Sequence, residues 1–520
     1  MPAWGELQED QLRLMARTIP DEVAYRNLDA RTALTFSEWE QRSNRLARGL
    51  VTLGVAPGDR VSIYLPADEV LRWIVAYAAV HKAGAVVVPT NTRLTVPELH
   101  TILEHGGAGV MLTCDSLLAT AIDVAARVAS LQTIVCAGAL DASASIDVRA
   151  WDAVVADDDS ELQVPVELTD LADIMYTSGT TGLPKGIAVR HGNVAMIPNH
   201  EPAWTGGGWL HGAPMFTFAG IAFVYNPMKL GLTGFYQPKF DAGRWLRYVE
   251  TERPTSTMLV PSFAELIVAH PGFETADLTS LQQVSIGSAP LAPATHRRLI
   301  ERLPDATVGN SYGMSEAGPA YIVMPKEEIA NRVGSVGKPL GPMEIKIVGD
   351  ENDELPAREV GELLLRMQGK QREYYKDDDA TAATWTDDGW LRSGDLAYLD
   401  EDGFLYICGR KKDMIIRGGN NIYATDVEAV LLEHPDVQEA AVVGVPHTVL
   451  GEDVAAWIVP RAGTVPADDD VFAFCAERLA DYKRPRQLHV VDELPRNATG
   501  KVMKHHLHIR VATPSSTERG

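Results

Sequence analysis

The chain has 520 residues and is acidic, with 47 lysines and arginines against 70 aspartates and glutamates and a net charge of −23. This balance argues against a nucleic-acid-binding protein, which usually presents a basic surface, although a few lysines and backbone amides can still hold a phosphate. Hydrophobic residues make up 46% of the chain, which is ordinary for a globular protein with a large buried core.

Neither the cysteines nor the apolar segments indicate an exported or membrane-spanning protein. The four cysteines are scattered without a Cys-x-x-Cys pair, so we expect no zinc site and a reducing, cytoplasmic location. The N-terminal residues include acids where a signal peptide has basic residues. The most apolar stretch, 73–89, is interrupted by His81 and Lys82 and is short for a membrane span, so we interpret it as a helix that runs into a buried strand.

The first third of the chain alternates helical and strand patterns. The expected elements are an amphipathic helix over 35–53 with Thr35 or Ser37 as its cap, a strand over 60–65, a helix over 71–83 and a strand over 85–88. The same order of strand, helix and strand returns at 284–286, 293–302 and 307–311. This order predicts parallel sheets with helices on their faces.

The pattern changes after residue 333, where short alternating strands such as 344–348 and 362–366 predict a smaller β subdomain. The charged segment GRKKD, 409–413, is followed by a unit of about 100 residues with expected helices at 424–432 and 468–479 and strands at 438–445 and 454–460. We place the domain boundary near Lys412, which gives domains over 1–411 and 412–520. The predicted fold class is α/β, with two α/β subdomains and a β subdomain in the large N-terminal domain and a small α+β C-terminal domain.

The segment YTSGTTGLPKG, 176–186, predicts a phosphate-binding loop. Gly179 and Gly182 permit tight or left-handed backbone, and Lys185 adds a positive charge. Four hydroxyl groups can donate to phosphate oxygens, those of Thr177, Ser178, Thr180 and Thr181. The loop is not of the Walker type, because Lys185 is followed by glycine rather than by serine or threonine.

This loop resembles the phosphate loop of the adenylate-forming superfamily, which includes acyl-CoA synthetases, adenylation domains of peptide synthetases and beetle luciferases. Three later segments resemble further motifs of that superfamily, namely NSYGMSE at 310–316, SGDL at 393–396 and PRNATGK at 495–501. The resemblance covers nearly the whole chain. It implies an acyl-CoA synthetase that converts a carboxylic acid and ATP into an acyl adenylate and pyrophosphate, then transfers the acyl group to coenzyme A with release of AMP.

The resemblance also implies which residues bind the nucleotide. Tyr312 would lie against the adenine and Ser315 near the α-phosphate, while Asp395 and Arg410 would bind the ribose. The residues of the loop, from Thr177 to Lys185, would hold the phosphates.

Three residues would serve the adenylation chemistry, and the physical logic agrees with the roles that the resemblance implies. Glu316, with Thr180, would hold Mg²⁺, and Lys501 would enter the site from the C-terminal domain. A carboxylate that attacks an α-phosphate brings two anions together, so cations at Glu316 and Lys501 would neutralise the charge as pyrophosphate leaves. Positioning would supply much of the remaining rate.

The second half-reaction implies a mobile C-terminal domain that swings about Lys412. Gly418 and Gly419 would then leave room for the pantetheine arm of coenzyme A, although a glycine pair is also an ordinary strand-turn signal. The same segment departs from the superfamily pattern at Ala424 and Asp426, where proline and glutamate are usual.

The resemblance places an acyl pocket along the segment PMFTFAG, 214–220, and two later segments. Its lining would be Phe216, Thr217, Phe218, Gly287, Ser288 and Met314. These side chains are apolar or small, with no arginine or lysine to pair a second carboxylate, so we expect a fatty, aryl or bulky alicyclic acid rather than malonate. Thr217 stands where histidine is common, and Ser288 and Glu373 stand where glycine is common.

Several alternatives stay open. The departures would fit a variant that is competent mainly in the thioester-forming half-reaction, but Lys185, Glu316, Asp395 and Lys501 are all present, so we expect both steps. An adenylation enzyme that loads a carrier protein, a luciferase-like oxygenase and a non-catalytic nucleotide-binding sensor are the others, and Lys501 argues against the sensor. Expected partners are the acid, ATP and coenzyme A, without nucleic acid, in a monomer or homodimer.

Overall fold

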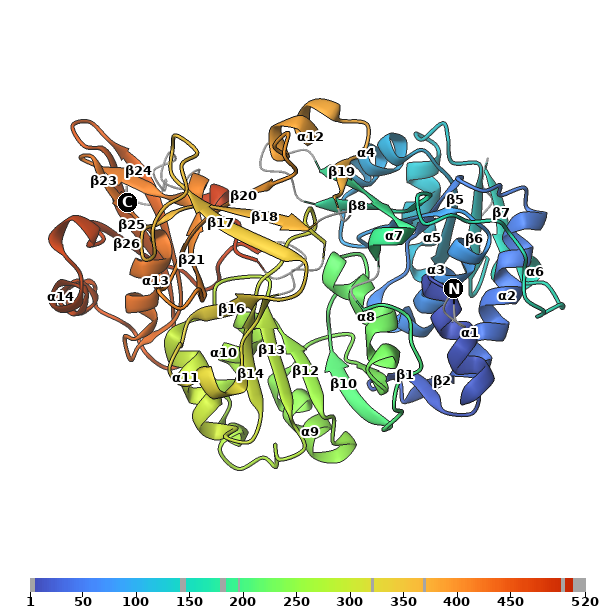
Figure 1. Cartoon of the computed structure of the whole chain (residues 1–520), viewed down its shortest axis with the longest axis horizontal. Coiled ribbons are helices and arrows are strands. Elements are labelled where there is room, and N and C mark those ends of the chain that lie inside the picture. Colours follow the sequence, from blue (N-terminus) through green and yellow to red (C-terminus); the bar gives the residue numbers. More distant parts are fainter. Residues whose placement is uncertain are drawn as a thin grey trace, which may run out of the picture.

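The computed structural model describes residues 5–140, 146–177, 184–194, 197–318, 322–367, 371–496 and 501–507. Four β-sheets organise these residues, and they follow one another from one side of the molecule to the other in Figure 1. The helices flank the sheets: α1 Gln8–Thr18, α2 Phe36–Thr52, α3 Val70–Lys82, α4 Val96–Gly106, α5 Asp115–Ala125, α6 Trp151–Val154, α7 His191–Val194, α8 Phe218–Lys229, α9 Ala242–Glu252, α10 Pro261–Ala269, α11 Pro293–Arg302, α12 Asp378–Thr384, α13 Ala424–Leu432 and α14 Asp468–Arg478.

The first sheet has the order β19-β9-β8-β4-β3-β5-β6-β7. Its strands are β3 Arg60–Ile63, β4 Val86–Pro89, β5 Ala108–Cys114, β6 Thr133–Ala137, β7 Asp147–Ala150, β8 Leu171–Thr177, β9 Lys185–Arg190 and β19 Glu373–Tyr374. Strands β3 to β8 pair in parallel, whereas β9 and β19 are antiparallel additions. Alternate residues of β4 enter two different hydrophobic clusters, so helices cover both faces as the strand–helix–strand order predicts.

The second sheet has the order β14-β13-β12-β10-β11-β1-β2. Its strands are β1 Val23–Asn27, β2 Thr32–Thr35, β10 Gly207–His211, β11 Leu232–Tyr236, β12 Ser256–Leu259, β13 Gln283–Gly287 and β14 Thr307–Ser311. All pairings are parallel except that of β1 with β2. The carboxyl ends of β13 and β14 therefore lie together, next to two of the segments that carry motifs.

The third sheet is antiparallel, with the order β15-β16-β21-β20-β18-β17. Its strands are β15 Ile322–Val323, β16 Ser335–Pro339, β17 Met343–Val348, β18 Gly361–Met367, β20 Leu391–Leu399 and β21 Leu405–Arg410. The fourth sheet comprises β22 Ile415–Arg417, β23 Asn420–Ile422, β24 Val437–His447, β25 Gly451–Pro460 and β26 Gln487–Val490. Lys412 lies in an exposed 3₁₀ turn, Lys411–Asp413, between the last strand of the third sheet and the first strand of the fourth.

Local sequence signals set several of these boundaries. Helix α2 begins after Thr35, whose hydroxyl accepts a hydrogen bond from the Glu38 amide at 3.2 Å, while the Glu38 carboxylate accepts one from the Thr35 amide at 3.0 Å. This capping box selects Thr35 over Ser37 as the cap. The apolar stretch 73–89 divides into α3 and β4, as expected, and within the described residues no helix is long and apolar enough to cross a bilayer.

A buried charge network ties α1 and α3 to the first sheet. His81 on α3 lies between two carboxylates, with Nδ1 at 2.8 Å from Glu9 and Nε2 at 3.2 Å from Asp173, and all three residues are buried. Burial alone would lower the pKa of His81, but the two carboxylates outweigh it and raise the pKa to about 10. His191 is close enough for a metal to join Glu9, His81 and His191. The bonds at both His81 nitrogens favour an imidazolium instead.

We expect His81→Leu to lower the thermal unfolding midpoint by about 5 °C or more, because it leaves two buried carboxylates without their cation. Burial would raise the pKa of Glu9, but His81 lowers it from 4.5 to about 2. The network should therefore stabilise most between about pH 4.5 and 6.5. Its contribution should decline as the pH rises from 6.5 through about 10, where His81 loses its proton in the folded protein.

The measurement is thermal unfolding of both proteins across this pH range. His100→Leu on α4 is the control, since within the described chain no polar partner of His100 is found. A difference between wild type and His81→Leu that stays constant from pH 6 to pH 10 would contradict the charged state assigned to His81.

Candidate active site

Asp395 is the centre of the candidate site. It lies on β20 directly across from Arg410 on β21, and the Arg410 Nε is 2.8 Å from one carboxylate oxygen. Tyr312, which follows β14 of the second sheet, donates its hydroxyl to the other oxygen at 2.6 Å. Ser393 accepts a hydrogen bond from the Asp395 amide at 3.0 Å, which holds the strand bend in place. Three residues that the sequence assigned to the nucleotide thus meet where two sheets meet.

Lys501 from the C-terminal segment reaches the same place. Its solution-accessible ammonium lies within electrostatic range of Asp395, Arg410 and Asp413. Desolvation, together with repulsion from Arg410, lowers the pKa of Lys501, while Asp395 opposes the shift. The fourth sheet is held near the third by Thr425 on α13, whose hydroxyl donates to the Cys408 carbonyl. The structure therefore has the lysine of the C-terminal domain beside the Asp395–Arg410 pair.

A second cluster joins the phosphate-loop hairpin to Glu316. Tyr374 on β19 donates its hydroxyl to the Glu316 carboxylate at 3.0 Å, and the Lys185 ammonium lies 4.9 Å from the centre of the Tyr374 ring. Desolvation by burial, together with the Glu316 carboxylate, raises the pKa of the Tyr374 phenol, so it stays a donor at neutral pH. Thr177 and Lys185 are opposite each other across β8 and β9, on either side of the loop. Tyr374 was not identified from the sequence, since nothing in REYY distinguishes it from a surface tyrosine.

The remaining loop predictions cannot be compared with the structure. Ser178, Gly179, Thr180, Thr181 and Gly182 lie outside the described residues.

Arg372 is a buried arginine that sequence reasoning missed. Its two amino groups donate to the carbonyl oxygens of Ser315 at 2.8 Å and Asn193 at 2.6 Å, and its guanidinium lies 4.8 Å from the centre of the Phe218 ring. Burial lowers its pKa to about 10. The expectation that no arginine borders the acyl pocket is therefore wrong, but two of the guanidinium nitrogens are already bound to carbonyl oxygens. The visible signal was the missing glycine at Glu373, which sits on the surface and pairs with Arg190 at 3.1 Å.

The acyl-pocket segments start α8 and end β13. Thr217 caps α8, because its hydroxyl accepts a hydrogen bond from the Gly220 amide at 3.1 Å and donates to the Pro214 carbonyl at 2.7 Å. At Gly287 a Cβ would lie 2.8 Å from the Ser311 carbonyl oxygen, so a larger residue would push β13 and β14 apart. Phe216 and Phe218 flank the cap, and Met314 closes the turn after β14 by pairing with Gly318. The histidine-to-threonine departure at residue 217 thus places a helix cap where the pocket begins.

The departures in the C-terminal domain are accommodated inside that domain. Gly418 and Gly419 form the two-residue turn between β22 and β23, with left-handed φ angles of 56° and 83°. Both glycines are exposed, so the turn signal is real and their role in a coenzyme A channel stays a prediction. Ala424 is buried at the start of α13, and Asp426 pairs with Lys483 at 2.8 Å.

Comparison with known proteins gives consistent matches over the chain. The AMP-binding enzyme family matches residues 12–375, and the AMP-binding enzyme C-terminal domain matches residues 426–501. Feruloyl-CoA synthase of an Amycolatopsis species is 36% identical over 94% of this chain and 96% of its own. A propanoyl:CoA ligase of Mycobacterium tuberculosis, whose acid bears a methyl-dioxo-octahydroindenyl group, is 34% identical over 95% and 96%. The anthranilate CoA ligase AuaEII in complex with anthranoyl-AMP superposes with a TM-score of 0.85 at 25% identity, over 99% of both chains.

We expect Ser288→Gly to stabilise the protein by about 1 kcal/mol. Ser288 has a φ of 75°, a left-handed conformation that costs a residue with a Cβ about 1–2 kcal/mol and costs glycine little. Ser285→Gly, in the extended backbone of β13, is the matched control and should destabilise by about 0.5–1 kcal/mol. Thermal unfolding of both variants checks the prediction, and a Ser288→Gly variant less stable than wild type would contradict it.

Proposed function

The chain belongs to the AMP-binding enzyme family and is an AMP-forming acid–CoA ligase, and on this premise we propose a role for each group in the site. The observation that carries the proposal is the meeting of Tyr312, Asp395, Arg410 and Lys501 from separate elements. Asp395 accepts the ribose hydroxyls while Arg410 and Tyr312 hold its carboxylate in place. Lys501 then stands on the same side as the phosphates and neutralises the charge that develops as pyrophosphate leaves.

We propose that Glu316 is the protein ligand of a magnesium ion. Tyr374 binds one of its carboxylate oxygens, and in the parts of the chain that the structure describes no other group is bonded to Glu316. The residues fit Mg²⁺, which takes oxygen ligands, keeps several waters and is usually held by one or two carboxylates together with substrate phosphates. The ion would supply charge neutralisation on the phosphates. The Tyr374 hydroxyl orients the carboxylate, and the Lys185 ammonium on the other side of that ring faces the loop.

The two half-reactions require two positions of the C-terminal domain, and we propose Lys412 as the hinge. Lys412 is exposed in a short 3₁₀ turn between two sheets, so a change of its backbone angles would rotate the fourth sheet with little repacking. Lys501 beside Asp395 corresponds to the adenylate-forming position. Rotation would withdraw Lys501 and bring the Gly418–Gly419 turn to the site, where its lack of side chains leaves room for the pantetheine arm.

The substrate is an aryl, fatty or alicyclic acid. We propose that its carboxylate lies at the carboxyl ends of β13 and β14, near Gly287 and Ser288, with Phe216 to Phe218 beside the acyl group. Arg372 holds Ser315 and Phe218 in register and is therefore a positioning residue for the acyl and phosphate sites together. The test of the overall function is a screen of carboxylic acids for pyrophosphate, AMP and CoA-thioester formation.

We expect Lys501→Ala to lower pyrophosphate release by about 100-fold or more, because it removes a cation that acts on the developing charge. Thioester formation from a ready-made acyl adenylate and coenzyme A should persist, since Lys501 is withdrawn in that step. Lys504→Ala is the matched control, because Lys504 pairs with Glu428 at 2.7 Å within the C-terminal domain. Full pyrophosphate release by Lys501→Ala would overturn the assigned role.

We expect Tyr374→Phe to raise the Mg²⁺ concentration needed for half-maximal pyrophosphate release by about 10-fold, since a hydrogen bond to a charged group contributes about 1.5–3 kcal/mol. Its fold should be retained, because only the hydroxyl is removed. Tyr375→Phe changes the neighbouring tyrosine, for whose hydroxyl no bond is found within the described chain, and should leave the Mg²⁺ titration as in wild type. An unchanged titration for Tyr374→Phe would show that this hydroxyl does not position the carboxylate.

A further inference from the structure

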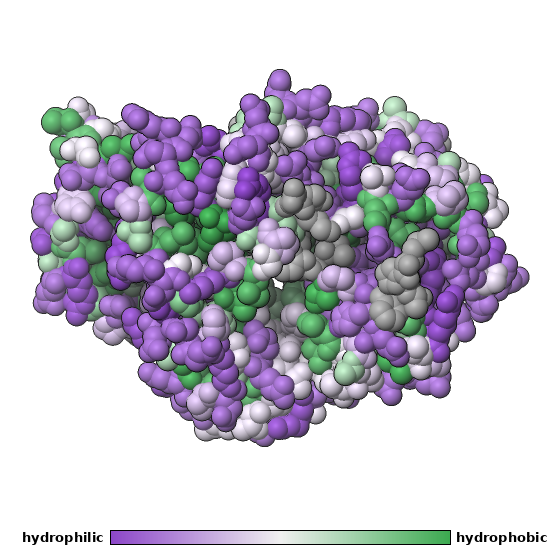
Figure 2. Space-filling view, in the orientation of Figure 1, coloured by the Kyte–Doolittle hydropathy of each residue, from purple (hydrophilic) through white to green (hydrophobic). Residues whose placement is uncertain are grey.

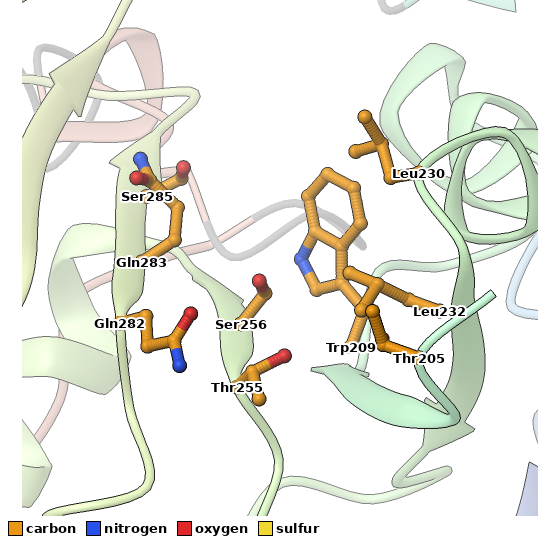
Figure 3. A pocket seen from close by; sticks show the side chains of 9 residues that line it. All are labelled: Thr205, Trp209, Leu230, Leu232, Thr255, Ser256, Gln282, Gln283 and Ser285. Atoms are coloured by element: carbon orange, nitrogen blue, oxygen red, sulfur yellow. The ribbon is translucent and has the colours of Figure 1, made fainter. Parts of the chain in front are cut away.

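A cavity of about 590 Å³ lies on the second sheet, at the amino ends of its strands. We call it the distal slot and define it by Trp209, Leu230, Leu232, Ser256, Gln283 and Ser285. Figure 3 shows the polar side chains of β12 and β13 along one wall and the Trp209 indole with the two leucines along the other. Figure 2 shows hydrophobic side chains beside a hollow that lies between β13 and α8 in the view of Figure 1.

The register of the sheet explains why these side chains share one face. Trp209 is opposite Ser256, and Ser256 is opposite Gln283, so the three side chains form a row across β10, β12 and β13. Residues two apart along a strand face the same side, and Ser285 and Gly287 therefore continue this face along β13. From Gln283 to Gly287 the strand advances by about 13 Å, and from Ser285 to Gly287 by about 7 Å. The distal slot thus lies on the same sheet face as the acyl pocket, about 7–13 Å further from the phosphates.

Helix α8 connects the two places on the opposite side. The Trp209 ring packs edge-on against Phe223 of α8 with ring centres 4.9 Å apart, and the same helix begins at Phe218 beside Arg372. An acid held between β13 and α8 would therefore extend from Ser288 toward Trp209 without crossing another element of the sheet.

The chemistry of the lining selects among acids. No charged side chain lines the slot, so an ionised group at the far end of a substrate would lose its hydration without gaining a counter-ion. The hydroxyl and amide groups of Ser256, Gln283 and Ser285 would in turn lose water without replacement against a purely aliphatic tail. The lining fits a body that is apolar on one side and carries an uncharged oxygen on the other.

One donor in the slot lacks a partner. The Trp209 Nε1 is shielded from solvent, and within the described part of the chain it makes no hydrogen bond. In Figure 3 this nitrogen is turned toward the wall formed by β12 and β13. Buried indole N–H groups usually have an acceptor, which indicates that a ligand supplies one here.

We propose that the distal slot binds the far end of the acid and that this end is an uncharged ring or chain bearing a carbonyl or hydroxyl oxygen. The oxygen accepts a hydrogen bond from Trp209 Nε1 and is bonded by Ser256 or Gln283, while Leu230 and Leu232 cover the apolar body. This inference rests on the proposed acyl site and narrows its substrate class to oxygenated aryl or alicyclic acids whose oxygen lies about 7–13 Å from the carboxyl group.

The test uses pairs of acids that differ only at the far end. The pair 4-(4-hydroxyphenyl)butanoic and 4-phenylbutanoic acid, and the pair 4-(4-acetylphenyl)butanoic and 4-(4-propylphenyl)butanoic acid, are compared by the kcat/KM of pyrophosphate release. We expect the oxygenated member of at least one pair to be preferred by about 10-fold, as one added hydrogen bond to a buried donor allows. Equal use of both members in both pairs would overturn the proposal.

Variants assign any preference to the slot. Trp209→Phe keeps a ring but removes the N–H, and it should reduce the preference ratio to near 1. Gln283→Leu should shift the ratio toward the unsubstituted acid. Trp245→Phe is the matched control: the Nε1 of Trp245 is also buried and without a partner in the described chain, but it lies in the hydrophobic cluster around α9. Trp245→Phe should keep the wild-type ratio, and a ratio that Trp209→Phe leaves unchanged would contradict the assigned contact.

Calorimetric titration of the same acids separates the two levels of the argument. If no acid yields pyrophosphate, the proposed function fails, yet tighter binding of the oxygenated acids to wild type than to Trp209→Phe would still support the slot. If acids are activated but bind and react without regard to the far oxygen, the slot proposal fails and the proposed function stands.

Discussion

The buried carboxylate of Asp395 is the constraint on which the site depends. A carboxylate that is 7% exposed needs strong donors, and it has them in Tyr312 from the second sheet and Arg410 from the adjacent strand of the third. The two sheets cannot separate without leaving this charge unpaired. Lys501 adds a second cation from a third part of the fold. A protein with a net charge of −23 thereby concentrates positive charge at the one place where a polyphosphate has to bind.

The residues that depart from the superfamily pattern make contacts that are consistent with the same site. Arg372 reaches from the first sheet to the Ser315 carbonyl, and its neighbour Tyr374 holds Glu316. Thr217 caps the helix that begins at the acyl pocket, and Ser288 keeps the left-handed backbone for which glycine is usual, at a cost in strain. These substitutions change the wall of the acyl pocket more than they change the nucleotide groups.

The direction of the strands gives the substrate its orientation. In parallel sheets, ligands bind beyond the carboxyl ends of the strands, and Gly287 and Ser311 end β13 and β14 side by side. The distal slot lies at the opposite, amino ends of β12 and β13, on the same face. One sheet face therefore carries two environments, small and apolar near the phosphates, then mixed with hydroxyl and amide groups farther away.

The sequence by itself determined the features that arise from local interactions. The predicted helices over 293–302 and 424–432 agree with α11 and α13, because amphipathic spacing and helix-end signals act within a few residues. The motifs predicted that Tyr312, Asp395 and Arg410 belong together, and the structure has them in contact. The roles of Thr180, Ser178 and their neighbours in the loop remain predictions of the sequence.

Only the tertiary structure decided which distant segments become neighbours. Strand β1 pairs with β11, although about 200 residues of chain separate Tyr25 from Gly234. Tyr374 meets Glu316, and Trp209 meets Ser256 and Gln283, through the order and register of strands. A slip of one residue in register would turn each of these side chains to the other face, and no pattern within a single strand encodes its register against a strand elsewhere in the chain. For that physical reason the chemistry was visible in the sequence, whereas the shape of the acyl site was not.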